Sequence, residues 1–173
     1  ELEIQKFKNY VDLKSNDIEF RLAKNSDLSN IKIDIFPQLR GYGENDKKYL
    51  LNPDLNTIFI GTYKQKIIHY FIVFKDPYNS PLIKTPLKKK YITENSVYLG
   101  SAFTLPEFRG KWITLNSISF ILSYLKSSKK FEKVLLLVHK KTKGAIPFFK
   151  RLGFVKIENA VPANIFEYIK EKL

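Results

Sequence analysis

The residues best suited to chemistry lie in a turn between an expected strand and an expected helix. Arg109, Gly110 and Lys111 come shortly after Pro106, which ends an apolar run, and an amphipathic segment begins at once. A helix N-terminus leaves about four backbone N–H groups unpaired and carries roughly half a positive charge. With two cationic side chains beside it, such a turn favours binding of a diphosphate. Taken alone, the pattern fits an ordinary basic strand-to-helix turn equally well.

A second segment with a recognisable arrangement lies further along the chain. Residues 134–138 are continuously apolar, as is typical of a strand buried on both faces. A short helix is predicted after them, with Thr142 able to cap its start and Gly153 as the C′ residue that closes it. Phe149 falls inside this helix.

These two segments carry a family resemblance. Residues 106–114 resemble the acetyl-CoA-binding signature of the GNAT superfamily, whose consensus runs Pro-Glu-Tyr-Arg-Gly-Lys-Gly-Ile-Gly. Residues 138–154 are similar to that family's second signature, in which a strand leads into Asn-x-x-Ala-x-x-x-Tyr-x-x-x-Gly-Phe. Each motif is weak separately, whereas both in this order and at this separation are specific. The similarity covers roughly residues 18–157.

The resemblance implies an N-acetyltransferase that uses acetyl-CoA as co-substrate, needs no metal, and lets an amine attack the thioester directly. It implies that the strand before Pro106 splays from the strand at 134–138, and that backbone groups of Thr104 and Leu105 pair with the pantetheine arm. An N–H near Leu105 would polarise the thioester carbonyl. The remaining donor-binding residues implied are Arg109, Gly110, Lys111, Trp112, Ile113, Thr114, Thr142 and Phe149.

The sequence departs from the family pattern at four of these positions. Trp112 stands where the family has glycine, and Thr114 where it has glycine or alanine. We expect the pyrophosphate-binding site to be preserved, with the indole of Trp112 at its edge. The alternative is that Trp112 packs in the core and the site is impaired. Thr142 replaces an asparagine, and Phe149 replaces the tyrosine that many members use as general acid. Phenylalanine cannot donate a proton, so another donor or unaided departure of the thiolate is required.

Candidates for proton transfer lie upstream on the strand that ends at Pro106. Glu94 could act as general base, and Tyr98 could supply a proton, although a solvated loop carboxylate is the simpler interpretation of Glu94. His69 and His139 are the two histidines, and a structural role is the better interpretation of His139. No histidines or carboxylates have metal-ligand spacing, so no metal site is predicted.

The predicted element order is β-α-β-β-β-α-β-α-β, an α/β fold with a mixed sheet. Alternation, apolar periodicity and turn residues give strands at 18–22, 57–63, 67–75, 97–105, 134–138 and 154–157, and helices at 25–36, 111–125 and 145–152. A last strand at 165–169 is a further option. We expect one domain over residues 1–173, with residues 1–16 as an N-terminal extension.

Composition sets limits on location and partners. There is no cysteine and no apolar stretch near the ~20 residues of a membrane span, so no membrane is expected and the cytoplasm is the default. The net charge of +13 favours anionic partners, but lysine used generally for solvation explains it as well. Nucleic acid is therefore an unlikely partner, and a homodimer stays open.

The expected function is N-acetylation of a small primary amine, such as an amino sugar, amino acid or polyamine. Aromatic residues in the segments that line the acceptor side in this family could shape its pocket or belong to the core: Phe36, Tyr42, Tyr49, Tyr70 and Tyr78. The alternatives are acetylation of a protein N-terminus or lysine, and a non-catalytic GNAT-like domain that binds CoA or another anionic ligand, such as nucleic acid.

Overall fold

The computed structural model describes residues 2–4, 17–29, 31, 49–77, 91–136, 138 and 144–157. Its strands are β1 (Leu2–Glu3), β2 (Ile18–Leu22), β3 (Asn56–Tyr63), β4 (Lys66–Phe74), β5 (Ser96–Thr104) and β6 (Lys133–Leu136). Its helices are α1 (Asn25–Leu28), α3 (Ile113–Ser128), α4 (Ala145–Arg151) and the 3-10 turn η5 (Pro106–Phe108).

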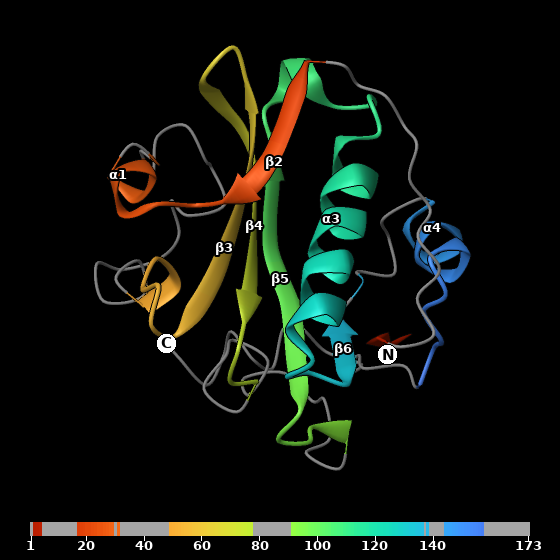
Figure 1. Cartoon of the computed structure of the whole chain (residues 1–173). Helices are drawn as coiled ribbons and strands as arrows, with labels where there is room; N and C mark the ends of the chain where they lie inside the picture. The colour runs from red at the N-terminus through yellow and green to blue at the C-terminus, as the bar shows by residue number, and fades with distance from the viewer. Residues whose placement is uncertain are drawn as a thin grey trace, which may run out of the picture.

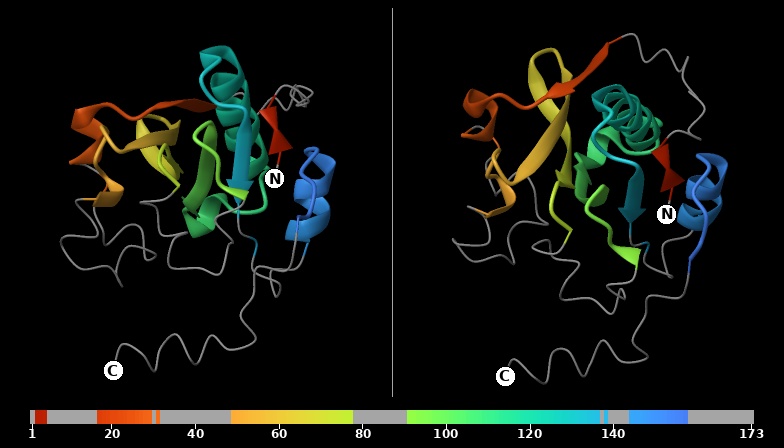
Figure 2. Two further views of the ribbon diagram at one scale, coloured as in Figure 1. Left: turned by 90° about the horizontal axis from the view of Figure 1, so that it is seen from below. Right: turned by 60° about the horizontal axis from the view of Figure 1, so that its bottom comes forward.

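The strands form one mixed sheet in the order β1-β6-β5-β4-β3-β2. The β5–β6 pair is parallel and the other neighbouring pairs are antiparallel. Figure 1 shows α3 running along one face of this sheet, while α1 lies near the β2 end and α4 near the β6 end. Figure 2 shows the same separation of α1 and α4 from two further directions. The predicted α/β fold with a mixed sheet and flanking helices is confirmed.

Strand alternation divides the buried side chains into two clusters. The helix-side core joins α3 residues such as Ile118 and Leu122 to Val97 and Leu99 of β5. The opposite-side core contains Ile58, Ile60, Tyr70, Phe103 and Ile113. Because successive side chains of a strand point to opposite faces, each of the central strands contributes to both cores. This is why β3, β4 and β5 contain consecutive apolar residues, such as Ile58, Phe59 and Ile60 of β3.

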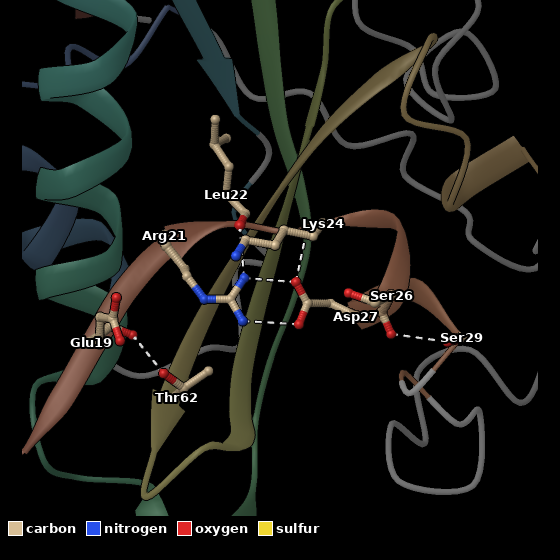
Figure 3. Close-up of polar contacts among 8 residues, drawn as sticks. All are labelled: Glu19, Arg21, Leu22, Lys24, Ser26, Asp27, Ser29 and Thr62. Carbon is tan, nitrogen blue, oxygen red and sulfur yellow. Dashed lines mark hydrogen bonds and ion pairs between the residues drawn. The ribbon is translucent and has the colours of Figure 1, made fainter.

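Local chemistry fixes how β2 leads into α1. The Arg21 guanidinium donates to both carboxylate oxygens of Asp27, at 2.6 and 2.9 Å, and the Lys24 backbone N–H donates to Asp27 Oδ2 at 2.6 Å (Figure 3). The hydrogen bond from Arg21 is the main cause that lowers the pKa of Asp27. A carboxylate in the first turn also suits the positive end of the helix. The Asp27 carboxylate therefore connects α1 to β2 through its hydrogen bonds with Arg21 and Lys24.

The structure differs from the sequence prediction at three places. Residues 154–157 are not a strand, although Phe154 is buried, and Leu2 and Glu3 form a strand that pairs with β6. The N-terminal residues Leu2 and Glu3 thus belong to the sheet. Helix α1 covers four residues of the predicted 25–36, and residues 32–36 lie outside the described part of the chain, as does 165–169.

Candidate active site

β5 extends beyond the strand beside it and leaves part of its edge open. The parallel pairing runs from Ser96↔Lys133 to Leu99↔Leu136, and β5 continues to Thr104 with no further β6 pairing among the described residues. The pairing with β4 shifts register at this point, and Ser101 has a positive φ of 49°. A β-bulge of this kind bends its strand. The open edge therefore begins where β5 turns away from β6.

The turn after β5 leads into an uncapped helix start. Gly110 has φ +75°, and a Cβ added there would meet nothing within 4 Å. Helix α3 begins at Ile113 and no side chain caps it; the Asn116 N–H donates to the Trp112 carbonyl at 3.0 Å. The N–H groups of Ile113, Thr114 and Leu115 therefore have no partner within the helix. Unpaired N–H groups at a helix start can bind a diphosphate, and the open space at Gly110 lies beside them.

The cationic side chains of this turn lie against aromatic rings. Arg109 Nε donates to the Thr104 carbonyl at 3.1 Å, and its Cζ lies 5.5 Å from the ring centroid of Phe103. Lys111 Nζ lies 5.2 Å from the ring centroid of Phe108. Such contacts hold a cation in place while its remaining N–H groups stay available to a ligand. Both charges are thus positioned beside the helix start.

Trp112 does not belong to the core. It precedes α3 in the left-handed conformation, with φ 60° and ψ 11°, and 59% of its surface is exposed. Glycine adopts this conformation at no steric cost. The left-handed backbone conformation therefore explains why the family consensus has glycine at this position. Trp112 adopts the same conformation and exposes its indole.

The Thr104–Leu105 peptide is already bonded on both sides. Leu105 N–H donates to the Ile68 carbonyl at 2.9 Å, and the Thr104 carbonyl accepts from Arg109. The Leu105 N–H consequently points to β4 and does not face the open edge, contrary to the expectation that it polarises the thioester. By strand alternation, the Thr104 N–H faces the open edge instead.

The two proton-transfer candidates occupy different surroundings on and before β5. Tyr98 is half-buried in the opposite-side core, where its ring stacks on Phe74 with centroids 5.6 Å apart. Glu94 is exposed in the turn before the strand. Ser96 is fully buried and closes that turn, because its hydroxyl lies 2.7 Å from Thr93 Oγ1. The structure brings Tyr98 close to the bulge and leaves Glu94 at the far end of β5.

Phe149 packs against the helix-side core from α4. Its ring contacts Phe148 and Phe154, with centroids 5.0 and 5.5 Å away, and Leu136 at the end of β6 packs on the same core. Gly153, with φ 92°, closes α4 as predicted. Tyr98 and Phe149 thus lie on opposite faces of the sheet, so the two side chains are not neighbours. Thr142 and His139 lie outside the described residues.

The aromatic residues expected on the acceptor side are largely structural where they can be followed. Tyr70 is 1% exposed and stacks on Phe103 in the opposite-side core. Tyr49 is half-buried and stacks on Phe74, and burial is the main cause that raises its pKa. Phe36, Tyr42 and Tyr78 lie outside the described residues.

Sequence reasoning missed two features of this region. One is the bulge at Ser101, for which the adjacent Gly100 was the available signal, because glycine inside a strand often marks a bulge or a close approach. The other is His69, whose Nδ1 lies 2.8 Å from Thr104 Oγ1 at the end of β5. His69 is completely buried, and burial lowers its pKa to about 4. Nothing in the sequence pattern pairs these two residues.

The fold and the site agree with a known family. The model of the acetyltransferase (GNAT) family matches residues 26–154, and the chain belongs to this family. It is accordingly an N-acetyltransferase, and acetyl-CoA is its co-substrate. No curated protein sequence matches the chain.

Solved structures of acetyltransferases share the fold at low sequence identity. An aminoglycoside acetyltransferase, meta-AAC0020, from an uncultured soil metagenomic sample in complex with sisomicin is 17% identical, with a TM-score of 0.61 over 86% of this chain and 95% of that one. Aminoglycoside N-acetyltransferase AAC(6')-Iy in complex with CoA is 16% identical, with a TM-score of 0.61 over 84% and 98%. Glucosamine-6-phosphate N-acetyltransferase from Arabidopsis thaliana is 16% identical, with a TM-score of 0.57 over 86% and 98%.

Two searches of the described residues gave negative results. None of the helices described is long and apolar enough to cross a bilayer. The same residues contain no group of three or more His, Cys, Asp or Glu side chains that could hold a metal ion.

Proposed function

We propose that this protein transfers the acetyl group of acetyl-CoA to the primary amine of a small molecule, with amino sugars the first class to test. The observation that carries the proposal is the open edge of β5 leading directly into the uncapped start of α3, with Arg109 and Lys111 beside it. The diphosphate would bind to the N–H groups from Ile113 onward and to the two cations. The pantetheine arm would follow the open edge beyond Leu99.

The thioester supplies an activated acyl group, and the amine replaces the thiolate on the carbonyl carbon. Because the diphosphate is assigned to Arg109 and the start of α3, the thioester would lie further back along the open edge, near the bulge. We therefore assign the Ala102 N–H to the carbonyl oxygen, since it faces the open edge there by strand alternation. Positioning of two bound reactants would provide most of the rate. A thiolate with a pKa near 8 or 9 can leave without a protein acid, which is consistent with phenylalanine at position 149.

The amine must lose a proton before or during the attack. Tyr98 lies two residues before Gly100 and the bulge, whereas Glu94 lies in the exposed turn at the start of the strand. At about 3.3 Å per residue, Glu94 is roughly 25 Å along the chain from Ala102, whereas Tyr98 is roughly 13 Å from it. We therefore propose Tyr98 as the nearer proton carrier, and Glu94 as a base that could act through water. Separate Tyr98→Phe and Glu94→Gln variants distinguish the two roles by their pH profiles.

The choice of amino sugars rests on two supports. Two of the similar structures are, by their names, aminoglycoside acetyltransferases, and a third acts on glucosamine-6-phosphate. The net charge of +13 repels polycationic acceptors at long range, so it favours neutral or anionic amino sugars over polyamines and aminoglycosides. The test is a turnover assay that detects released CoA across a panel containing all these classes.

Donor binding is measured separately by calorimetric titration with CoA. The Arg109→Ala, Lys111→Ala double variant should weaken binding by about 2 kcal/mol or more, because charge-assisted hydrogen bonds to phosphate are lost. A Lys126→Ala, Lys130→Ala variant removes the same charge at the other end of α3 and should bind CoA normally. An equal loss of CoA affinity in both variants would mean that CoA responds to the overall charge and not to a specific site at Arg109 and Lys111. Clear CoA binding without turnover of any amine would instead favour a non-catalytic domain.

A further inference from the structure

A buried histidine lies directly behind the end of β5. His69 of β4 is cross-strand partner of Thr104, and its Nδ1 lies 2.8 Å from Thr104 Oγ1. The rings of Phe20 and Phe71 pack edge-on against the imidazole, with centroids 6.3 and 6.2 Å away. Since the imidazole is completely buried, it cannot touch a ligand at the surface. Besides a hydrogen bond with the Phe103 backbone, its polar contact with the end of β5 is the Thr104 hydroxyl.

The peptide after Thr104 is fixed in one orientation. The Leu105 N–H bonds the Ile68 carbonyl on β4. In a planar trans peptide the C=O and N–H point in opposite directions, so the Thr104 carbonyl must point away from β4. It accepts there a hydrogen bond from Arg109 Nε, at 3.1 Å. Thr104 is therefore held to β4 by its side chain and its following N–H, and presents its carbonyl to Arg109.

This arrangement leaves the ligand-binding part of Arg109 available. A guanidinium has five N–H groups, and one of them, on Nε, is used by Thr104. The ring of Phe103 lies against the guanidinium from β5. The four N–H groups of the terminal nitrogens can then bind phosphate oxygens in the forked geometry that arginine favours. Holding the side chain in place beforehand reduces the entropy lost on binding.

We propose that His69 is a positioning residue for the donor site, acting through Thr104 to hold Arg109 ready for the diphosphate of CoA. The inference rests on the proposed function. It predicts that removing the Thr104 hydroxyl weakens CoA binding although that hydroxyl is directed at His69 and not at the ligand. It also predicts that this effect disappears when Arg109 is absent.

The experiment is a double-variant cycle on the full chain, with the Kd for CoA measured by calorimetry. Thr104→Val keeps the branched shape and should raise the Kd roughly three- to tenfold, as expected for one hydrogen bond. In an Arg109→Ala background the same change should have no further effect. Thr104→Ser should bind like the unchanged protein. His69→Asn retains an amide near the place of Nδ1 and should lose less affinity than His69→Leu.

A matched control separates positioning from stability. Thr62 of β3 is also buried, and its hydroxyl lies 3.4 Å from the Glu19 carbonyl. Thr62→Val should lower the Tm without changing the Kd for CoA. An unchanged Kd for Thr104→Val, or an equal loss with and without Arg109, would overturn the inference while leaving the proposed function intact. Failure of the unchanged protein to bind CoA would overturn both.

Discussion

At the scale of the residue, Trp112 combines an unfavourable backbone conformation with an exposed side chain. A left-handed conformation costs a non-glycine residue roughly 1–2 kcal/mol. Because the residue precedes the helix, glycine there does not carry the cost of glycine inside a helix. We therefore expect Trp112→Gly to raise the free energy of unfolding by about 1 kcal/mol and to keep CoA affinity. Urea unfolding and calorimetry measure the two quantities.

Lys129 provides the matched control for this change. It follows α3 with φ 53°, the same conformation at the opposite end of the same helix. Lys129→Gly should give a similar gain in stability and no change in CoA binding. A large loss of CoA affinity in Trp112→Gly alone would show that the indole contacts the ligand.

Phe149 bears on whether a protein acid takes part. We expect Phe149→Tyr to leave the rate level or to raise it modestly, because general acid help matters only where the thiolate needs it. Since Tyr98 lies on the other face of the sheet, Tyr98→Phe and Phe149→Tyr should have additive effects on the logarithm of kcat. Restoration of the Tyr98→Phe rate by Phe149→Tyr would contradict that arrangement.

At the scale of the element, the lack of a side chain at Gly100 allows β5 to pack closely against the rings of Tyr98 and Phe74. A Cβ at this position would lie 2.7 Å from Tyr98 Cε1 and 3.1 Å from Phe74 Cε2. The two rings are stacked on each other, so neither can move without disturbing the other. We expect Gly100→Ala to cost roughly 1–3 kcal/mol of stability, measured by urea unfolding. In a Tyr98→Ala background the cost should be clearly smaller; an equal cost would place the strain in the backbone.

Element boundaries show what local signals can predict. The strand at 18–22 and the ends set by Pro106 and Gly153 were predicted because alternation, a missing N–H and a C′ glycine act within a few residues. The pairing of β1 with β6 could not be predicted, because the paired residues lie more than a hundred positions apart in the sequence. The link between His69 and Thr104 likewise depends on the β4–β5 register.

At the scale of the whole molecule, the buried His69 makes stability depend on pH. Its pKa is lowered from 6.5 to about 4 by burial, so between these values the unfolded chain binds a proton that the folded protein does not. The free energy of unfolding should therefore fall as the pH drops from about 6.5 to 4, by roughly 3 kcal/mol in total. Above pH 6.5 this contribution is fully present.

Comparison with His69→Leu isolates this contribution. The lowered pKa of Asp27 also costs stability in acid, but it does so equally in both proteins. The slope of the free energy of unfolding against pH should thus be shallower in the variant between pH 6.5 and 4. Identical slopes would mean that His69 is not buried and neutral in solution.

The distribution of charge bears on the alternative of a nucleic-acid partner. Exposed lysines of the described residues occur at the β3–β4 hairpin, at the C-terminal end of α3 and on α4, for example Lys64, Lys129 and Lys150. A helix of sixteen residues spans about 24 Å, so the lysines at its two ends are far apart. The described lysines are thus distributed over several elements, which favours general solvation over a nucleic-acid groove.

Because the sequence contains one tryptophan, the position of Trp112 also gives the protein a built-in optical probe. Light absorbed by tryptophan and not by the ten tyrosines excites a single indole, which lies in water at the start of α3. Its emission therefore reports local polarity and quenching at the donor turn, with no other tryptophan to dilute the signal. Stopped-flow mixing with CoA could follow arrival and departure of the donor in real time, without a label.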